Sequence, residues 1–482
     1  MVELLNKIAG AIWSMPLIFL ILLVSLYFSI RMGFPQLTHF KEMTRLLKEK
    51  GAAEEGLSPL QSFIFTAART IGVGNIAGMA TGIYFGGPGA IFWLWVLAIF
   101  GSSIAIIEGT LAQTYKEVIN NEFKGGPANY MEHGMKNKKL GKGLAVLYSF
   151  ITFISLTFLM SGVQSFYIVQ GLNEAFGFKK IILGIVITAC LGVVIFGGIK
   201  RMGKAAQRIS PIVGTIYVFM SIIVIVLNIT KLPSTFALIF KSAFGKDAIF
   251  GAIFGSALQW GIRRGVHANE VGIGTSAVTS ATGTVKHPVQ QGLLSGLSVY
   301  IGTLFVCTTT TLMILMTNSY NVIDTKTNKL VYEGAKGLEY GNPFVSNAIQ
   351  KVIPIPNFGN IFIALAILFF AFIALTAFYL YAESNLAYII GDKKIGFFLL
   401  KIGFLVSVFV GTLVASDTIW AMADIGNGLM AWINVIALVL VGNTGIKVYK
   451  DYKKQKDSGI TTPIFKPEEL GMTDVGKTWY NK

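Results

Sequence analysis

Residues 68–78 read Ala-Arg-Thr-Ile-Gly-Val-Gly-Asn-Ile-Ala-Gly, and they interrupt an apolar segment, residues 60–85, that is long enough to cross a bilayer. A spanning helix satisfies its backbone N–H and C=O groups internally, because hydrocarbon offers them no partner. Gly72 and Gly74 let the backbone leave helical geometry without steric cost. The freed N–H groups can hold an anion and the freed carbonyls a cation. We therefore interpret Gly72, Gly74 and Asn75 as part of a substrate site.

This stretch has two other interpretations. Residues 72–78 resemble a dinucleotide-binding fingerprint, but that motif requires a preceding strand and an acidic residue about 20 positions further on. Here both flanks are apolar helix, and the next acidic residue is Glu108. Glycines at every fourth position from Gly74 to Gly86 also favour close helix packing in lipid. We expect this packing role in addition to the site.

Composition places the chain among polytopic membrane proteins. Of its 482 residues 53% are hydrophobic and 13% are charged, roughly half the charged share of soluble domains. Cys190 and Cys307 both lie in apolar spans, so we expect neither a disulfide framework nor a metal cluster. No nucleophile stands beside a base in the sequence, and we therefore do not expect an enzyme.

The pattern predicts an all-α polytopic membrane protein with eleven transmembrane helices. The first span is too long for a signal-peptide core and has no Ala-x-Ala cleavage site. A second glycine-interrupted span, broken by Gly251, Gly255 and Gly261, matches the one at residues 60–85. The expected spans are residues 11–30, 60–85, 88–115, 143–175, 181–198, 209–229, 248–263, 290–316, 361–390, 396–415 and 419–441.

Lysine and arginine are concentrated in alternate loops, which predicts the N-terminus outside and the C-terminus in the cytoplasm. Residue 204 then lies inside and residue 328 outside. We expect a multi-pass protein of the plasma (inner) membrane. The net charge of +16 is explained by this orientation and by contact with anionic membrane lipid, so we expect no nucleic-acid partner.

The spans divide into two halves after one extra N-terminal helix. We expect an N-terminal helix and link (residues 1–59), a first five-helix repeat (60–229), a second five-helix repeat (230–445) and a cytoplasmic tail (446–482). An odd number of spans per repeat makes this a 5+5 inverted repeat. Two broken helices in corresponding positions predict a transporter site, with a carboxylate at the half-helix N-termini and a cation at the carbonyls.

Several motifs resemble the alanine/glycine:cation symporter family. They are Arg-Thr-Ile-Gly-Val-Gly-Asn-Ile-Ala-Gly-Met-Ala-Thr at 69–81, Gly-Gly-Pro-Gly-Ala-Ile-Phe-Trp-Leu-Trp at 86–95, Gly-Ile-Arg-Arg-Gly at 261–265, Asn-Glu-Val-Gly at 269–272, Ala-Asp-Ile at 423–425 and Gly-Leu-Met-Ala at 428–431. Gly-Gly-Pro at 125–127 and Gln164 match in order. The resemblance covers about residues 60 to 445. It implies a leucine-transporter-type fold and sodium-coupled uptake of small neutral amino acids, alanine or glycine, with Na⁺ as coupling ion and no organic cofactor.

The chain departs from the family pattern at positions that bear on ion stoichiometry and substrate preference. These are Ala268 in place of serine, Gly302-Thr303 in place of Asp-Thr, Ile373-Ala374 in place of a Ser-Thr pair, and Ser165-Phe166 where an asparagine is expected.

The expected substrate site combines both broken spans with the third core helix. Gln164 either hydrogen-bonds the substrate or bridges helices, and the resemblance favours the substrate. Asn75 either caps the second half-helix or contacts the substrate, and both roles are compatible. The expected substrate-binding residues are Gly72, Gly74, Asn75, Gln164, Phe166, Gly255, Ser256, Gln259 and Trp260.

The fold that the resemblance implies places sodium between carbonyls near Thr70 and Val73 and hydroxyls of the eighth core helix. Ile373 and Ala374 occupy the usual hydroxyl positions and cannot ligate through their side chains. Thr376 lies about one turn further and is our candidate replacement. The alternative is that Thr376 only bonds back to its own helix.

Ionisable groups in or near spans are functional candidates by default. They are Glu108, Glu270, Glu383 and Asp424. We expect Glu270 and Glu383 to pair with bases such as Arg263 or Lys401, and Arg69 to contribute to an inner gate. The functional alternatives are a proton-coupled amino-acid transporter and an ion channel. A channel fits less well, because no ring of pore-lining charge is evident.

Overall fold

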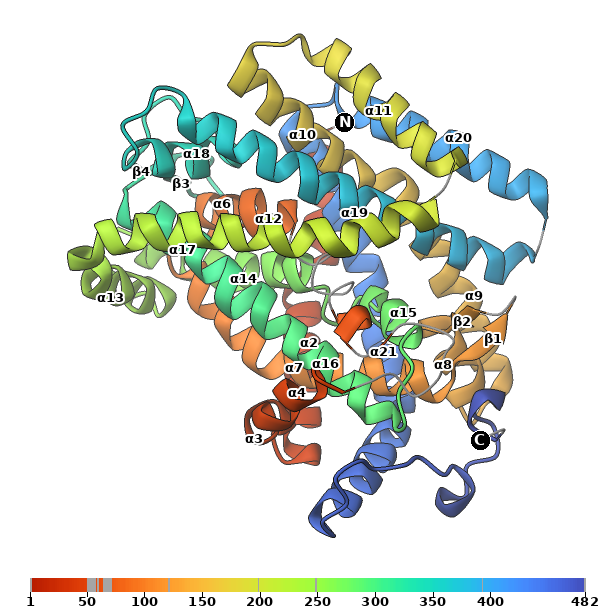
Figure 1. Cartoon of the computed structure of the whole chain (residues 1–482). Helices are drawn as coiled ribbons and strands as arrows, with labels where there is room; N and C mark the ends of the chain where they lie inside the picture. The colour runs from red at the N-terminus through yellow and green to blue at the C-terminus, as the bar shows by residue number, and fades with distance from the viewer. Residues whose placement is uncertain are drawn as a thin grey trace.

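Long helices pack side by side through most of the chain (Figure 1). The computed structural model describes residues 2–49, 58, 60–63, 72–119, 122–197, 199–247, 249–391 and 393–480. Its α-helices are α1 (Val2–Ile12), α2 (Met15–Met32), α3 (Pro35–Thr38), α4 (Phe40–Leu46), α6 (Val73–Gly86), α7 (Ala90–Thr114), α8 (Pro127–Gly134), α9 (Lys138–Ile154), α10 (Ser161–Phe176), α11 (Lys180–Gly197), α12 (Ile199–Leu227), α13 (Leu232–Ala243), α14 (Phe254–Asn269), α15 (Thr275–Ala281), α16 (Pro288–Val299), α17 (Thr308–Met316), α18 (Asn342–Gln350), α19 (Phe358–Ile390), α20 (Lys394–Gly411) and α21 (Ser416–Asp457).

Two π-helical turns join helices that follow each other in sequence. The turn η1 (Ser155–Leu159) links α9 to α10, and η4 (Tyr300–Cys307) links α16 to α17. Such turns are rare and occur often at functional positions. Short 3₁₀ turns complete the helical elements: η2 (Ile229–Lys231), η3 (Gly251–Ile253), η5 (Glu468–Leu470) and η6 (Lys477–Trp479).

Nine helices in the described part of the chain are long and apolar enough to cross a membrane, which confirms a helical polytopic membrane protein. They are Val2–Met32, Ala90–Thr114, Lys138–Phe176, Lys180–Gly197, Ile209–Leu227, Pro288–Met316, Phe358–Ile390, Lys394–Gly411 and Ser416–Asp457. The two spans expected to be broken are not among them, because α6 has 14 residues and α14 has 16. The count of eleven spans remains a prediction.

Two short antiparallel hairpins correct the expectation of an all-α chain. Strands β1 (Glu117–Ile119) and β2 (Glu122–Lys124) pair with Val118 opposite Phe123. Strands β3 (Asn321–Ile323) and β4 (Leu330–Glu333) pair with Val322 opposite Tyr332. Both hairpins lie in connections between long helices.

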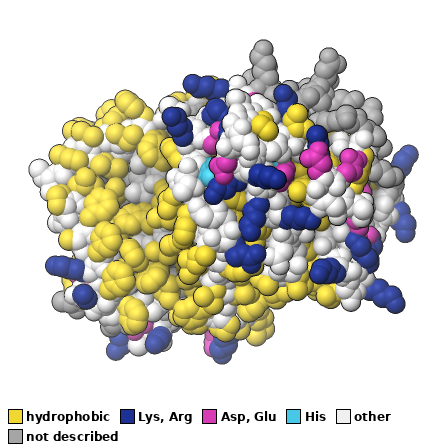
Figure 2. All heavy atoms as spheres, turned by 90° about the horizontal axis from the view of Figure 1, so that it is seen from below, with side chains coloured by type: hydrophobic (Ala, Val, Ile, Leu, Met, Phe, Trp, Pro, Cys, Tyr) yellow, Lys and Arg dark blue, Asp and Glu magenta, His cyan; other side chains and the backbone are white. Residues whose placement is uncertain are grey.

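Large apolar side chains are exposed along α11, α12 and α20, including Ile185, Val193, Phe219, Phe398 and Val406. Figure 2 shows a face on which apolar side chains cover a broad area and charged side chains gather beside it. Soluble monomers rarely expose apolar patches of this extent. The surface is suited to contact with lipid.

The segment after α21 returns to the C-terminal end of α7. The backbone N–H of Gly476 donates to the Thr114 carbonyl (3.1 Å), and Trp479 Nε1 donates to the Gln113 carbonyl (2.9 Å). The last carbonyls of a helix have no partner within it. The chain's own tail therefore caps α7.

At the same end of the molecule, α4 is tied to α21. Glu42 accepts hydrogen bonds from Arg45 (2.8 and 2.9 Å) and from the Tyr452 hydroxyl (2.6 Å). Burial alone would raise the pKa of Glu42, but the hydrogen bonds from Arg45 and Tyr452 lower it to about 2. Glu42 is therefore ionised under physiological conditions.

Candidate functional site

The interruption predicted at Gly72 is confirmed on its C-terminal side, where α6 begins at Val73. Gly72 has an extended backbone, and its N–H donates to the Asn75 side-chain oxygen at 3.1 Å. Asn75 thus caps the half-helix, which is one of the two roles expected for it. Residues 64–71, including Arg69 and Thr70, lie outside the described residues.

The second interruption lies further along the chain than expected. α14 runs unbroken through Gly255 and Gly261 to Asn269, and the helix resumes at Thr275. The break expected at Gly255 and Gly261 is therefore wrong, whereas Gly251 lies in the 3₁₀ turn η3 before α14. Residues 270–274 form the break, with φ values of +58° at Glu270, +80° at Gly272 and +86° at Gly274.

The N-terminus of α6 lies directly against the end of α14, next to the second interruption. A Cβ atom added at Gly74 would lie 3.0 Å from His267 Cδ2 and 3.3 Å from the Ala268 Cα. We expected Gly74 to be part of a substrate site. The structure fills the space beside its Cα with α14, so Gly74 permits two half-helices to touch.

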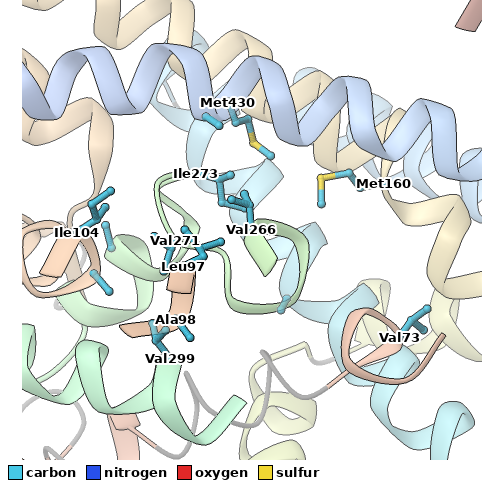
Figure 3. Packing of buried hydrophobic residues seen from close by; sticks show 14 of the residues in the cluster. Val73, Leu97, Ala98, Ile104, Met160, Val266, Val271, Ile273, Val299 and Met430 are labelled. Carbon is cyan, nitrogen blue, oxygen red and sulfur yellow. The ribbon is translucent and has the colours of Figure 1, made fainter. Parts of the chain in front are cut away.

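The second interruption is itself packed on its apolar side. Val271 lies beside Leu97 of α7, and Ile273 and Val266 point towards Met430 of α21 (Figure 3). All of these side chains are buried. The break is held in protein on this side, as non-helical backbone at membrane depth requires.

Asn75 also links α6 to the π-helical turn η4. Its Nδ2 donates to the Gly302 carbonyl at 2.9 Å and contacts the Cys307 sulfur at 3.2 Å. The amide therefore fixes the half-helix against a turn whose own helical bonding is irregular. Its donors are engaged in the structure, and a bound substrate would share the Asn75 oxygen.

Gln164 and Phe166 both lie on α10, the third core helix of the expected repeat. Gln164 is 4% exposed, and its Oε1 has no hydrogen-bond partner among the described residues. Leaving a buried amide oxygen unpaired costs about 1–3 kcal/mol. Phe166 packs edge-on against Tyr167, with ring centroids 5.1 Å apart. Gln164 is thus a buried acceptor available to a ligand.

The other expected substrate residues lie near the N-terminal end of α14, away from the interruption. Ser256 Oγ is 3.2 Å from Thr325 Oγ1, and Gln259 donates to the Trp13 carbonyl at 2.8 Å. Gly255 has no described atom within 4 Å of an added Cβ. Of this group, Trp260 lines a cavity.

That cavity, which we call the vestibule, has a volume of about 620 Å³. Aromatic rings form much of its wall, with Trp260 stacked on Phe85 (4.5 Å between centroids) and Tyr340 stacked on Tyr84 (4.7 Å). Its lining residues are Glu3, Asn6, Lys7, Tyr84, Phe85, Trp260, Arg263, Ile323, Thr325, Asn328, Tyr340, Asp417, Trp420, Ala421 and Asp424.

A buried charge cluster joins α14 to α21 where Arg263 and Asp424 line the vestibule. Asp424 pairs with Arg263 at 2.6 Å and also with Arg264. Trp260 and Trp420 flank the cluster, with the Arg263 guanidinium 4.5 Å from the Trp260 ring and that of Arg264 4.4 Å from Trp420. One carboxylate thus serves two guanidinium groups, and Arg263 and Asp424 form part of the vestibule wall.

This pairing corrects two expectations from the sequence. Arg263 pairs with Asp424 rather than with Glu270. Glu383 accepts a hydrogen bond from Tyr379 (2.9 Å), and Lys401 lies over the ring of Phe196 rather than beside that carboxylate. Side chains in different helices decide these pairs, and loop position gave no signal for them.

Sequence reasoning missed the polar pair next to the charge cluster. The His267 ring nitrogen Nδ1 lies 2.5 Å from Asn427 Nδ2, joining the end of α14 to α21. His267 is also the side chain that Gly74 approaches. Its position one helical turn after Arg263 and Arg264 was the available signal.

Two of the three expected sodium ligands lie in the described part of the chain. Val73 is fully buried at the first position of α6. Thr376 on α19 is buried, and its hydroxyl donates to the Ile373 carbonyl at 2.7 Å. This is the bond of the structural alternative, although it leaves the lone pairs of the Thr376 oxygen unassigned.

Comparison with known proteins gives a consistent picture. The sequence profile of the sodium:alanine symporter family matches residues 1–467. The sodium/proton-dependent alanine carrier protein of Bacillus sp. (strain PS3) is 41% identical over 441 residues, covering 91% of this chain and 97% of the relative. The sodium/alanine symporter AgcS of Methanococcus maripaludis is 32% identical over 457 residues, covering 94% and 97%.

A solved structure shows the same fold. The substrate-bound, outward-open structure of a Na⁺-coupled sialic acid symporter aligns with a TM-score of 0.51 at 13% identity. The alignment covers 98% of this chain and 94% of that one. At this identity the likeness concerns the fold alone.

Proposed function

Because the chain belongs to the sodium:alanine symporter family, we propose that it imports a small neutral amino acid, alanine or glycine, together with sodium across the plasma membrane. The observation that carries this proposal is the direct contact between two interrupted helices, α6 and α14, at Gly74 and His267. Paired interruptions of this kind bind substrate and ion in transporters built from repeats.

In our proposal the substrate carboxylate lies at the start of α6. The first N–H groups of a helix lack partners within it and favour an anion. The Asn75 oxygen and the unpaired Gln164 Oε1 are acceptors for the substrate ammonium group. Close contact at Gly74 leaves little room beside the backbone, which favours a small side chain.

Sodium is placed at the other side of the same interruption. We assign it the carbonyls of Thr70 and Val73 and the oxygen of Thr376, whose proton is already donated to the Ile373 carbonyl. Hard cations prefer oxygen ligands of this type. A second candidate coupling ion is the proton, because the relative from Bacillus sp. (strain PS3) carries the name sodium/proton-dependent alanine carrier protein.

We further propose eleven spans in a 5+5 inverted repeat, with the N-terminus outside. The nine continuous spans together with the two interrupted ones give this number. In our proposal the vestibule opens to the outside in this orientation, and the Arg263–Asp424 pair in its wall acts as an outer gate.

Uptake into proteoliposomes tests the proposal. Labelled alanine and glycine should accumulate when sodium is high outside and should not accumulate when potassium replaces it on both sides. An excess of unlabelled alanine should compete with the label. Saturable alanine uptake that is indifferent to sodium would remove the sodium assignment, and flux without saturation would favour a channel.

A further inference from the structure

Glu108 is a fully buried carboxylate on α7 that the proposed sodium and substrate sites do not use. It lies in the C-terminal third of a membrane-length helix, Ala90–Thr114. Acidic residues at such positions are costly, and they are functional candidates by default.

The carboxylate holds the second interruption through uncharged donors. Asn434 Nδ2 of α21 donates to Glu108 Oε1 at 2.5 Å, and Ser276 Oγ of α15 donates to Oε2 at 3.3 Å. The backbone N–H of Gly272 also bonds to the carboxylate. The same Asn434 nitrogen donates to the Gly272 carbonyl at 3.0 Å. Glu108 and Asn434 together therefore contact both the N–H and the carbonyl of Gly272 in the break.

No cation neutralises this carboxylate among the described residues. No lysine, arginine or histidine in the described part of the chain lies within 4 Å of Glu108, whereas Asp424 has two arginines. An ionised carboxylate with only neutral donors is expensive to keep in a protein interior. Either a proton or a bound cation must therefore lower that cost.

Three titratable groups around Glu108 are a carboxyl group and two tyrosine hydroxyls. Glu270 interacts electrostatically with Glu108 from the break itself. From α8, Tyr130 donates to the Asn434 oxygen, and from α9, Tyr148 donates to the Ile273 carbonyl at 2.7 Å.

Among the described residues, the other elements packed on α7 place no lysine, arginine or histidine within 4 Å of Glu108. α3, α15 and α16 contain no titratable residue. On α14, Arg263 and Arg264 are committed to Asp424, and His267 to Asn427. On α2, Arg31 and Tyr27 bond each other. The other titratable residues on these elements are Tyr300 and Cys307 on η4, Tyr84 on α6, Lys241 on α13, and Glu132 and His133 on α8. On α21 they are Asp417, Lys447, Tyr449, Lys450, Asp451, Tyr452, Lys453, Lys454, Lys456 and Asp457.

We propose that Glu108 is a proton-binding site and that its proton is carried with the amino acid. On one side of the membrane the carboxylate takes a proton from hydronium, forming an O–H bond and releasing water, and on the other side it returns the proton to water. This inference rests on the proposed amino-acid transport and assigns a residue to its second coupling ion.

The geometry connects the proton to the substrate site. An ionised Glu108 accepts from Gly272 N–H, but a protonated carboxyl has one oxygen that becomes a donor. The interaction between Glu108 and Gly272 therefore differs between the ionised and the protonated carboxyl group. Residues 270–274 follow the end of α14, where His267 and Ala268 contact Gly74. A change at Gly272 thus reaches the N-terminus of α6 over a short path.

The test uses purified protein in proteoliposomes containing a pH-sensitive dye. Alanine added outside, under a sodium gradient, should acidify the lumen of wild-type vesicles. Glu108→Gln should still take up labelled alanine but should lose this acidification. Uptake by the wild type should rise about tenfold per unit of external acidification above its midpoint, and uptake by Glu108→Gln should stay flat. Glu383→Gln, a second glutamate within a span, is the matched control and should retain both properties.

Asn434→Ala provides a second variant. It removes a donor that favours the ionised carboxylate, so the midpoint of the pH profile should move to higher pH by about one unit. A midpoint that stays in place or moves lower would contradict the assignment, as would acidification by Glu108→Gln at the wild-type level.

Infrared difference spectra test protonation of Glu108 without measuring transport. Acidifying detergent-purified wild type should produce a protonated-carboxyl band that is absent from Glu108→Gln and present in Glu383→Gln. Wild-type protein that transports no amino acid yet shows this band would refute the transport proposal and retain the proton site. Amino-acid uptake with neither band nor acidification would retain transport and overturn the proton site.

Discussion

Removing the carboxylate of Asp424 should damage the protein more than removing either arginine. The side chains of Asp424 and Arg264 are each 1% exposed, and that of Arg263 is 7% exposed. Asp424→Asn leaves two buried guanidinium groups with no counter-charge. Breaking a buried pair in this way typically costs about 3–5 kcal/mol.

Arg263→Gln should be much milder, because it leaves Arg264 and Asp424 as a one-to-one pair. It removes one charge-assisted hydrogen bond, worth about 1.5–3 kcal/mol. It also relieves the repulsion between two adjacent guanidinium groups, which offsets part of that loss. We therefore expect Asp424→Asn to lower the thermal unfolding midpoint by at least twice as much as Arg263→Gln.

Thermal unfolding in detergent can be followed by tryptophan fluorescence, because Trp260 and Trp420 flank the cluster. Asp324→Asn, in an exposed turn, is the control for loss of a carboxylate and should leave the midpoint within error. Arg263→Gln that destabilises more than Asp424→Asn would refute the reasoning, since it would mean that the second guanidinium is needed more than the shared carboxylate.

The fold and the site also predict four simpler outcomes. Gly74→Val should abolish alanine uptake and lower the unfolding midpoint, because its side chain would collide with α14, whereas wild-type uptake would detach Gly74 from the site. Thr376→Val should raise the sodium concentration for half-maximal uptake, and an unchanged value would leave the hydroxyl structural. In a background without native cysteines, a cysteine at Asn328 should react with an impermeant reagent from outside and one at Lys204 only after permeabilisation; reversed labelling contradicts the orientation. The pKa of Glu42 is lowered to about 2 from its ordinary value near 4.5. Its contribution to the free energy of unfolding is therefore fully present above pH 4.5 and should be lost as the pH falls towards 2. Glu42→Gln should accordingly reduce the fall of the unfolding midpoint between pH 4.5 and pH 2.

The glycine pattern predicted the first interruption well and the second poorly. Gly72 marks a real change in backbone because Val73 begins a helix there. Gly261 serves close packing instead, since an added Cβ would lie 2.3 Å from the Ala90 carbonyl oxygen and would keep α14 away from α7. A glycine required for close packing and one required for an unwound turn look the same in sequence.

The local sequence pattern does not predict which polar side chains pair over long distances in the chain. Arg264 and Asp424 are 160 positions apart, and only the packing of α14 on α21 joins them. The break at residues 270–274 includes Glu270, a non-glycine residue in the left-handed region, which glycine spacing does not reveal. The apolar pattern, by contrast, depends on local composition and located most of the continuous spans to within a few residues, whereas the helix at Val2–Met32 begins earlier and the helix at Ser416–Asp457 ends later than expected.

The contact between the C-terminal segment and α7 determines where a truncated protein can end. The family profile stops at residue 467, which invites truncation there. Such a cut would remove Gly476 and Trp479, which donate hydrogen bonds to the last carbonyls of α7. A helix that carries Glu108 would then fray from an end that the sequence places more than 360 positions away from its cap. Protein intended for spectroscopy or crystallisation should therefore keep these last residues, even though the family as a whole does not define them.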